Sequence, residues 1–222
     1  MISSWSVIVP VKGTGDAKSR LGGTARSRRA LAKAIALDTV EAVLSTPGVG
    51  MVLVVTSAAA APDFAALGAV VLVEEPAIGD PGGLNAAIEA GIRSLAAGEA
   101  AGSRGDVPVA VLLGDLPALQ PHELASALTA AAGFRLAMVP DADNTGTVLI
   151  TARPGVLLIP AFGPGSRAAH QALGYVELTI PASSGLRRDV DTVEQLTSVL
   201  ASAPQLMGRR TAPVRSGGIG VV

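Results

Sequence analysis

Short, uninterrupted aliphatic runs recur along this chain of 222 residues and alternate with longer alanine-rich segments of helical spacing. In these runs apolar residues follow one another directly, which is typical of strands covered on both faces of a sheet. The predicted strands are residues 5–11, 51–56, 69–74, 107–114, 135–141, 147–152 and 176–180. The predicted helices are residues 25–45, 58–67, 83–97, 121–132 and 192–201.

This repeated strand–helix–strand order predicts a single α/β domain, Rossmann-like, with a mostly parallel sheet and helices on both faces. We expect a small antiparallel insertion around the sequence DNTGTVLI, which begins at Asp143. The loops after the first four predicted strands would lie along the carboxyl edge of the sheet, where such folds bind ligands. The domain is expected to span residues 1–203, followed by a loosely ordered, glycine- and arginine-rich tail at residues 204–222.

Composition excludes several classes of function. The net charge is −1, so no basic field for nucleic acid is present. The absence of cysteine removes disulfides, thiolate zinc sites and cysteine nucleophiles. No stretch approaches the roughly 20 apolar residues of a membrane span, and the N-terminus lacks the basic region of a signal peptide. We therefore expect a cytoplasmic protein with no nucleic-acid or membrane partner.

The loop after the first predicted strand, PVKGTGDAKSRLGG, contains glycines and cations. A G-x-G-x-x-G fingerprint fails because Lys18 stands at its sixth position, and a P-loop fails because Ala17 precedes the lysine. Backbone amides in a glycine turn, together with Lys12, Lys18 and Arg20, would suit a polyphosphate. The alternative is a solvated surface loop. Its position at the expected binding edge favours the ligand-facing interpretation.

Acidic residues follow two segments that are far apart in the chain. Asp115 ends the apolar fourth strand, and because an unpaired buried carboxylate is costly, it is expected at the strand exit facing a cation. Asp189 and Asp191 are two residues apart and would share a face in extended backbone. Carboxylates that converge on a polyphosphate form a Mg²⁺ site. For Asp191 a second interpretation stays open, in which it caps a helix that begins at Thr192 and Glu194 completes a capping box.

Other common catalytic signatures are missing. His122 and His170 are the only histidines, too few to indicate a zinc site. No G-x-S-x-G elbow is present, so a serine hydrolase lacks its nucleophile signature.

Six segments, in this order, resemble the guanylyltransferases of coenzyme F420 biosynthesis: PVKGTGDAKSRL, GDPGGLNAAI, LLGDLPAL, NTGTVLI, FGPGSRAAH and LRRDVDTVEQL. The similarity runs from about Val7 to Leu196. It implies a nucleotidyltransferase fold and transfer of GMP from GTP to phosphoenolpyruvate or 2-phospho-L-lactate, with release of pyrophosphate. Phosphoenolpyruvate, which would give enolpyruvoyl-2-diphospho-5′-guanosine, is preferred because LLGDLPALQ and LRRDVDT look most like the actinobacterial branch.

The resemblance also implies roles for individual residues. Asp115 and Asp189 correspond to the metal-binding acids, with Asp191 as a close neighbour and Mg²⁺ as the ion. The residues that correspond to positions binding the phosphorylated three-carbon acid are Thr147, Gly163 and Ser166.

A phosphate dianion is already a competent nucleophile, so such a transfer depends on positioning and charge neutralisation rather than on a general base. Lys18 and Arg20 would hold the leaving pyrophosphate, with Lys12 and Gly13 beside them on the nucleotide, while Asp115 completes the catalytic set.

The segment GGLNAAI is the predicted guanine site, because Gly83 leaves room for the ring and Asn85 could read a base edge. The alternative for Asn85 is an ordinary polar residue at a helix start.

Three other functions remain under consideration. The nearest is nucleotidyl transfer to another acceptor, such as 3-phosphoglycerate or a molybdenum-cofactor precursor. A nucleotide-binding module without catalysis is the non-enzyme alternative, and a Rossmann-type oxidoreductase fails on the glycine spacing. A homodimer is compatible with the resemblance, but the sequence does not fix the oligomeric state.

Overall fold

The computed structural model describes residues 4–11, 24–74, 83–98, 107–190, 192, 195–197 and 208–212. Its strands are β1 (Trp5–Pro10), β2 (Val49–Thr56), β3 (Val70–Val73), β4 (Val109–Leu112), β5 (Leu136–Pro140), β6 (Thr147–Ala152) and β7 (Val176–Glu177). Its helices are α1 (Ala25–Leu44), α2 (Ala61–Ala65), α3 (Gly83–Ala96), α4 (Pro121–Ala131), α5 (Ser166–Ala172) and the 3-10 turn η1 (Gly185–Arg187).

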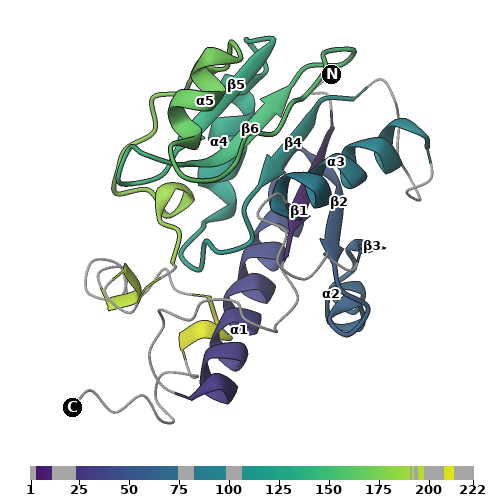
Figure 1. The fold of residues 1–222 in the computed structure, drawn as a ribbon, viewed down its shortest axis with the longest axis vertical. Coiled ribbons are helices and arrows are strands. Elements are labelled where there is room, and N and C mark those ends of the chain that lie inside the picture. The colour runs from purple at the N-terminus through teal and green to yellow at the C-terminus, as the bar shows by residue number, and fades with distance from the viewer. Residues whose placement is uncertain are drawn as a thin grey trace.

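The strands form one seven-stranded sheet in the order β3-β2-β1-β4-β6-β5-β7 (Figure 1). β3, β2, β1 and β4 are parallel neighbours, whereas β6 runs antiparallel to both β4 and β5, and β7 is parallel to β5. The predicted α/β sheet with an antiparallel insertion is therefore confirmed. The exits of β1, β2, β3 and β4 all lie on the carboxyl edge.

Both faces of the central strands are covered, which explains their continuous apolar sequences. Every residue of β1 is buried. Val7 and Val9 belong to a core with residues of α1 and α4, whereas Ile8 belongs to a second core with Ile88 of α3. Successive side chains of a strand point to opposite faces, so every side chain of β1 faces one of the two cores.

Helix boundaries in the first half follow local signals. Thr24 is the N-cap of α1, where its hydroxyl accepts from Ser27 N–H at 3.1 Å. α4 begins at Pro121, and Glu123 Oε2 accepts from Gln120 N–H at 3.0 Å. None of the helices in the described part of the chain is both long and apolar enough to span a bilayer.

The second half departs from the predicted elements. α5 was not predicted, because its approach through FGPGS indicates a turn and its N-cap, Gly165, has φ 72°. β7 has two residues rather than the five expected for residues 176–180. The helix predicted at residues 192–201 lies mostly outside the described residues, although residues 195–197 are helical.

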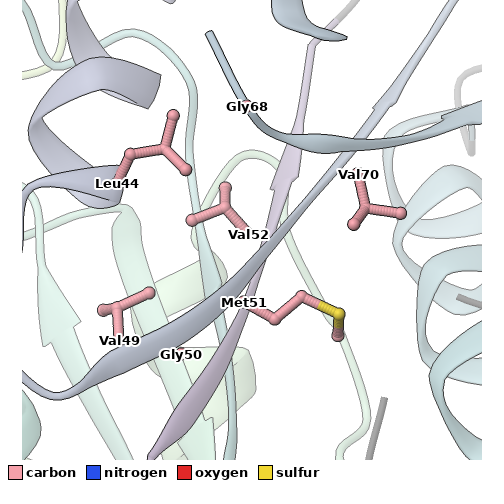
Figure 2. A pocket seen from close by; sticks show the side chains of 7 residues that line it. All are labelled: Leu44, Val49, Gly50, Met51, Val52, Gly68 and Val70. Atoms are coloured by element: carbon pink, nitrogen blue, oxygen red, sulfur yellow. The ribbon is translucent and has the colours of Figure 1, made fainter. Parts of the chain in front are cut away.

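An open pocket of about 190 Å³ lined by apolar side chains lies at the amino-terminal end of β2 and β3, away from the carboxyl edge (Figure 2). Its lining residues are Leu44, Val49, Gly50, Met51, Val52, Gly68 and Val70. These side chains carry no charge and no hydrogen-bonding group, so the pocket does not suit a phosphorylated ligand.

Candidate functional site

Asp115, at the exit of β4, lies close to the start of β6 and to the end of β1. Asp115 is partly buried and is the third residue after the strand ends at Leu112. Leu113 N–H donates to the Val148 carbonyl at 3.0 Å, which places this exit beside the start of β6. A Cβ at Gly114 would meet the carbonyl oxygen of Pro10 at 3.1 Å, so the end of β1, where the glycine-containing loop departs, also lies against it.

The segment with the second acidic pair lies directly beside Asp115. The amide of Val190, which is fully buried between Asp189 and Asp191, donates to the Asp115 carbonyl at 3.0 Å. Two acids that are far apart in the sequence thus belong to adjoining backbone segments. Within the described residues no three His, Cys, Asp or Glu side chains gather closely enough to hold a metal ion. Asp191 lies outside those residues, so the metal assignment stays a prediction.

A capping box is present one residue after the one predicted with Asp191. Thr192 Oγ1 accepts from Gln195 N–H at 3.2 Å, and Gln195 Oε1 accepts from Thr192 N–H at 3.0 Å. This reciprocal pair is a capping box one residue later than the one predicted with Glu194. Asp191 and Glu194 lie outside the described residues, so the cap and the metal-ligand interpretations of Asp191 both stay predictions.

Two segments hold the loop after Asp115: helix α1 and residues 208–212, which we call the chain end. Leu116 N–H donates to Thr39 Oγ1 at 3.1 Å, and the Pro117 carbonyl accepts from Gly208 N–H at 3.0 Å. The buried Asp38 carboxylate accepts from Thr211 N–H at 2.7 Å and Thr211 Oγ1 at 2.6 Å. Of the segment predicted to be a loosely ordered tail, the structure describes residues 208–212, and these are bonded to α1.

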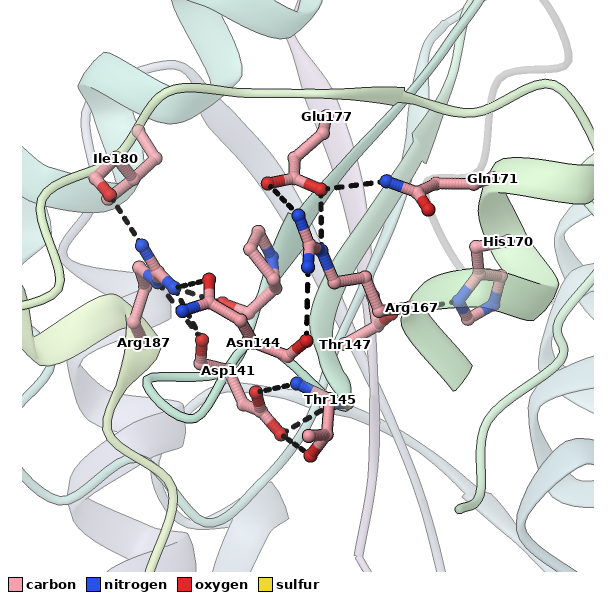
Figure 3. Close-up of polar contacts among 12 residues, drawn as sticks. Asp141, Asn144, Thr145, Thr147, Arg167, His170, Gln171, Glu177, Ile180 and Arg187 are labelled. Atoms are coloured by element: carbon pink, nitrogen blue, oxygen red, sulfur yellow. Dashed lines mark hydrogen bonds and ion pairs between the residues drawn. The ribbon is translucent and has the colours of Figure 1, made fainter. Parts of the chain in front are cut away.

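Of the predicted acceptor-binding residues Thr147, Gly163 and Ser166, Thr147 is linked by His170 to α5, the helix that begins at Ser166 (Figure 3 shows the Thr147 side). Thr147 is the first residue of β6 and Ser166 the first of α5, and each is 3% exposed. Gly163 is exposed and has φ 137°, a conformation that favours glycine. Ser166 N–H donates to the Gly163 carbonyl at 3.0 Å, which closes the turn between them.

His170 fixes the direction in which the Thr147 hydroxyl donates. His170 Nε2 accepts from Ala161 N–H at 2.9 Å, so the proton of the neutral ring is on Nδ1, which lies 3.0 Å from Thr147 Oγ1. Burial lowers the pKa of His170 to about 4, against a smaller opposing hydrogen bond to the Ser166 backbone. The ring is therefore neutral near pH 7, Thr147 Oγ1 accepts from it, and the threonine hydrogen can point at a ligand.

A buried arginine anchors the hairpin that leads into Thr147 (Figure 3). Arg187 is 7% exposed, and its guanidinium donates to the Asp141 carbonyl at 2.6 Å, to the Ile180 carbonyl at 2.8 Å and to Asn144 Oδ1 at 2.7 Å. The Asp141 carboxylate closes the turn by accepting from Gly146 N–H at 2.7 Å. The start of β6 is consequently fixed to the segment that carries Asp189.

The Asn85 side chain, predicted to read guanine, contacts protein backbone. Its Nδ2 donates to the Phe162 carbonyl and its Oδ1 accepts from Phe162 N–H, both at 2.9 Å. Gly83 is the first residue of α3. The remaining nucleotide residues Lys12, Gly13, Lys18 and Arg20 lie outside the described residues, and their roles stay predictions.

Comparison with known proteins places the chain in a family, although no family model matches it. A phosphoenolpyruvate guanylyltransferase of Streptomyces coelicolor is 48% identical over 213 residues, covering 95% of each chain. Proteins of the same name from Salinispora arenicola and Thermomonospora curvata are each 46% identical, covering 96% and 94% of this chain and 94% and 87% of their own. The chain belongs to the phosphoenolpyruvate guanylyltransferase family.

Solved structures show that this family member has a nucleotidyltransferase fold. A Methanothermobacter nucleotidyl transferase aligns with a TM-score of 0.59 and 20% identity, covering 91% of this chain and 98% of its own. Rv0371c of Mycobacterium tuberculosis, solved in complex with manganese, aligns with a TM-score of 0.54 and 17% identity, covering 90% and 98%. At such identities the likeness concerns the fold alone.

Sequence reasoning missed the residues that position the site in this phosphoenolpyruvate guanylyltransferase family member. Arg187 and His170 stand in the segments LRRDVDT and FGPGSRAAH, but neither was assigned a role there. Glu123 was also missed: its carboxylate accepts from Ser184 Oγ at 2.8 Å and Gly185 N–H at 3.0 Å, which joins α4 to η1. A histidine four residues after the predicted Ser166 was the one available signal, since such residues share a helix face.

Proposed function

We propose that this chain transfers the GMP group of GTP to phosphoenolpyruvate, giving enolpyruvoyl-2-diphospho-5′-guanosine and pyrophosphate, as a step of coenzyme F420 biosynthesis in the cytoplasm. The family supports the reaction. The observation that carries the proposal is the 3.0 Å hydrogen bond from Val190 to Asp115, because it joins the two acidic segments beside the exit of β1. The acceptor follows the name shared by the relatives, with 2-phospho-L-lactate as the alternative.

In this reaction an oxygen of the acceptor phosphate forms a bond to the α-phosphorus of GTP. The bond from that phosphorus to the oxygen bridging to the β-phosphate breaks, and pyrophosphate leaves with the electron pair. The acceptor oxygen carries no proton to remove. The protein therefore has to align two polyanions and offset their mutual repulsion, which is the contribution made by preorganised charges and donors.

The acidic residues fit a divalent ion. Asp115 is partly buried, and its backbone is bonded to the residue between Asp189 and Asp191, so hard oxygen ligands come from adjoining segments. Because Thr192 is the N-cap, helix formation does not require the Asp191 carboxylate. We assign Mg²⁺ to Asp115, Asp189 and Asp191, where it would neutralise phosphate charge when bound.

The acceptor is a small anion and needs hydrogen-bond donors. Thr147 offers its hydroxyl proton, because Oγ1 already accepts from His170. Ser166 adds a second hydroxyl, and the exposed turn at Gly163 leaves backbone open to a ligand.

The nucleotide is assigned to the other side of the site. Lys12, Gly13, Lys18 and Arg20 would surround the triphosphate, because they follow β1, whose end packs against Gly114. Gly83, at the start of α3, would lie beneath guanine.

The test incubates purified protein with GTP, Mg²⁺ and, in parallel, phosphoenolpyruvate, 2-phospho-L-lactate or 3-phosphoglycerate, and measures pyrophosphate release. Release is expected with phosphoenolpyruvate and GTP, and much less with ATP or CTP. Asp115→Asn is expected to lower kcat on the order of 100-fold or more, because a charge is lost at the transferred phosphate.

Asp63→Asn is the matched control, since it removes a surface carboxylate from α2 that is paired with Lys33. It should leave kcat unchanged. Absence of pyrophosphate release with all three acids would refute the transferase proposal. Full activity of Asp115→Asn would refute the assigned metal site.

A further inference from the structure

The side-chain amide of Asn85 is bonded to the backbone of a residue 77 positions away. Its oxygen and one of its N–H groups are matched to both polar groups of Phe162, each at 2.9 Å. A pair of this kind fixes both the distance and the orientation of the loop relative to α3. It also uses one of the two N–H groups and one of the two acceptor positions of the oxygen, so that the amide is oriented by the protein backbone rather than by a base.

The residue before Phe162 is held by a different helix, α5. Ala161 N–H donates to His170 Nε2 at 2.9 Å, and the rings of Phe162 and His170 meet edge-on with centroids 5.0 Å apart. Residues 161 and 162 are thus held between α3 and α5.

The residues that follow have little support of their own. Gly163, Pro164 and Gly165 are exposed, and both glycines have positive φ. Glycine in such a turn is conformationally permissive, so the position of the turn depends on what precedes and follows it. Ser166 and α5 fix one side, and the bonds at Ala161 and Phe162 fix the other.

We propose that Asn85 is a positioning residue for the acceptor: by holding Phe162 against α3, it fixes the turn at Gly163 at the distance from the nucleotide that transfer requires. This inference rests on the proposed function and replaces base reading as the role of Asn85. It makes α3 the element that joins the two substrate sites, since Gly83 begins the same helix turn.

The test compares Asn85→Ala with wild type in the GTP and phosphoenolpyruvate assay. The KM for phosphoenolpyruvate is expected to rise about tenfold, the effect of losing roughly one net hydrogen bond. The KM for GTP should change less than about twofold, and the preference for GTP over ATP should be kept. Amide hydrogen exchange at Phe162 should become faster, because its acceptor is removed. Asn85→Gln keeps the amide and should restore part of the acceptor affinity.

Glu89→Ala is the control, because Glu89 is exposed on α3 one turn further along. It should change none of these quantities. An unchanged KM for phosphoenolpyruvate in Asn85→Ala would overturn the inference, as would a loss of the GTP preference, which would mark Asn85 as a base reader. If Asn85→Ala does not fold, the KM for phosphoenolpyruvate of Asn85→Gln is compared with that of Glu89→Ala, and a value above the control is expected. A wild type inactive with every acid would instead refute the proposed function.

Discussion

The two halves of the sheet share the same two apolar cores, but they differ in the polar contacts around them. In the parallel half, formed by β3, β2, β1 and β4, buried aliphatic side chains pack against helices on both faces. In the mixed half, formed by β6, β5 and β7, side chains of Asn85, His170 and Arg187 bind the backbone of loops and of the hairpin. Aliphatic contacts lack direction, whereas hydrogen bonds fix orientation. Apolar contacts in either half should therefore determine stability, and the polar contacts of the mixed half should also determine how the acceptor is held.

The largest effect on stability is expected from a substitution that creates a new cavity in the core of the parallel half. Leu53 of β2 is 1% exposed, and Leu53→Ala should lower the free energy of unfolding by about 2–5 kcal/mol. Denaturant titration measures this loss. Below the melting temperature, the KM for phosphoenolpyruvate should match wild type, because Leu53 pairs with β1 and β3 and not with a strand of the mixed half. Val73→Ala on the neighbouring strand is the control, since Val73 is 49% exposed, and it should cost less than about 1 kcal/mol. A raised KM in Leu53→Ala would show that the halves are not separable.

Arg187→Met should affect both stability and acceptor binding. The substitution keeps an apolar stem but leaves the Asp141 and Ile180 carbonyls without their donor, at an expected cost of about 2–4 kcal/mol. The hairpin before Thr147 loses its anchor, so the KM for phosphoenolpyruvate should rise as well. Arg153→Met, at an exposed site after β6, is the matched control. Loss of stability without any change in the KM for phosphoenolpyruvate would contradict a role of Arg187 in acceptor binding.

The His170 contacts make the mixed half sensitive to acid. The pKa of His170 is lowered to about 4 in the folded protein, from 6.5, so the unfolded chain binds the proton more readily. Stability from this residue is fully present above about pH 6.5, falls as the pH is lowered, and is lost below about pH 4, by up to about 3 kcal/mol. His170→Gln, whose amide oxygen can still accept from Ala161, should show a shallower loss between pH 6.5 and 4. Equal slopes for the two proteins in urea titrations would contradict this assignment.

The contrast between the halves also explains what sequence reasoning could and could not predict. β1, β2 and β4 were predictable because a strand buried on both faces must be largely apolar along its length, and such a run can be recognised from the residue types alone. α5 was missed because a seven-residue helix entered through Gly165 has too few turns for a periodic pattern.

The polar contacts of the site could not be predicted for a different reason. Asn85 bonds to the backbone of Phe162, 77 positions away, and Arg187 to that of Asp141, 46 positions away. Nearly every residue has the same backbone carbonyl and N–H, so the residue type does not indicate which backbone group a side chain will bind. That Asp115 and Asp189 would lie near each other was expected from the chemistry of a Mg²⁺ site and from the family resemblance, not from a predicted place of Asp189 in the sheet.

The smallest expected effect comes from the polar contact of the parallel half. Asp38 on α1 is 5% exposed and accepts from Thr211 and Arg210 of the chain end. Asp38→Asn replaces one accepting oxygen by an N–H₂ group that faces those donors, and should cost about 1–2 kcal/mol. Asp63→Asn makes the same exchange in an exposed ion pair with Lys33 and should cost less than about 1 kcal/mol. Gly208 also donates to Pro117, two residues after Asp115. A fall in kcat of Asp38→Asn beyond that of the control would therefore show that residues 208–212 support Asp115. It would also show that directional contacts matter for the site in both halves of the sheet.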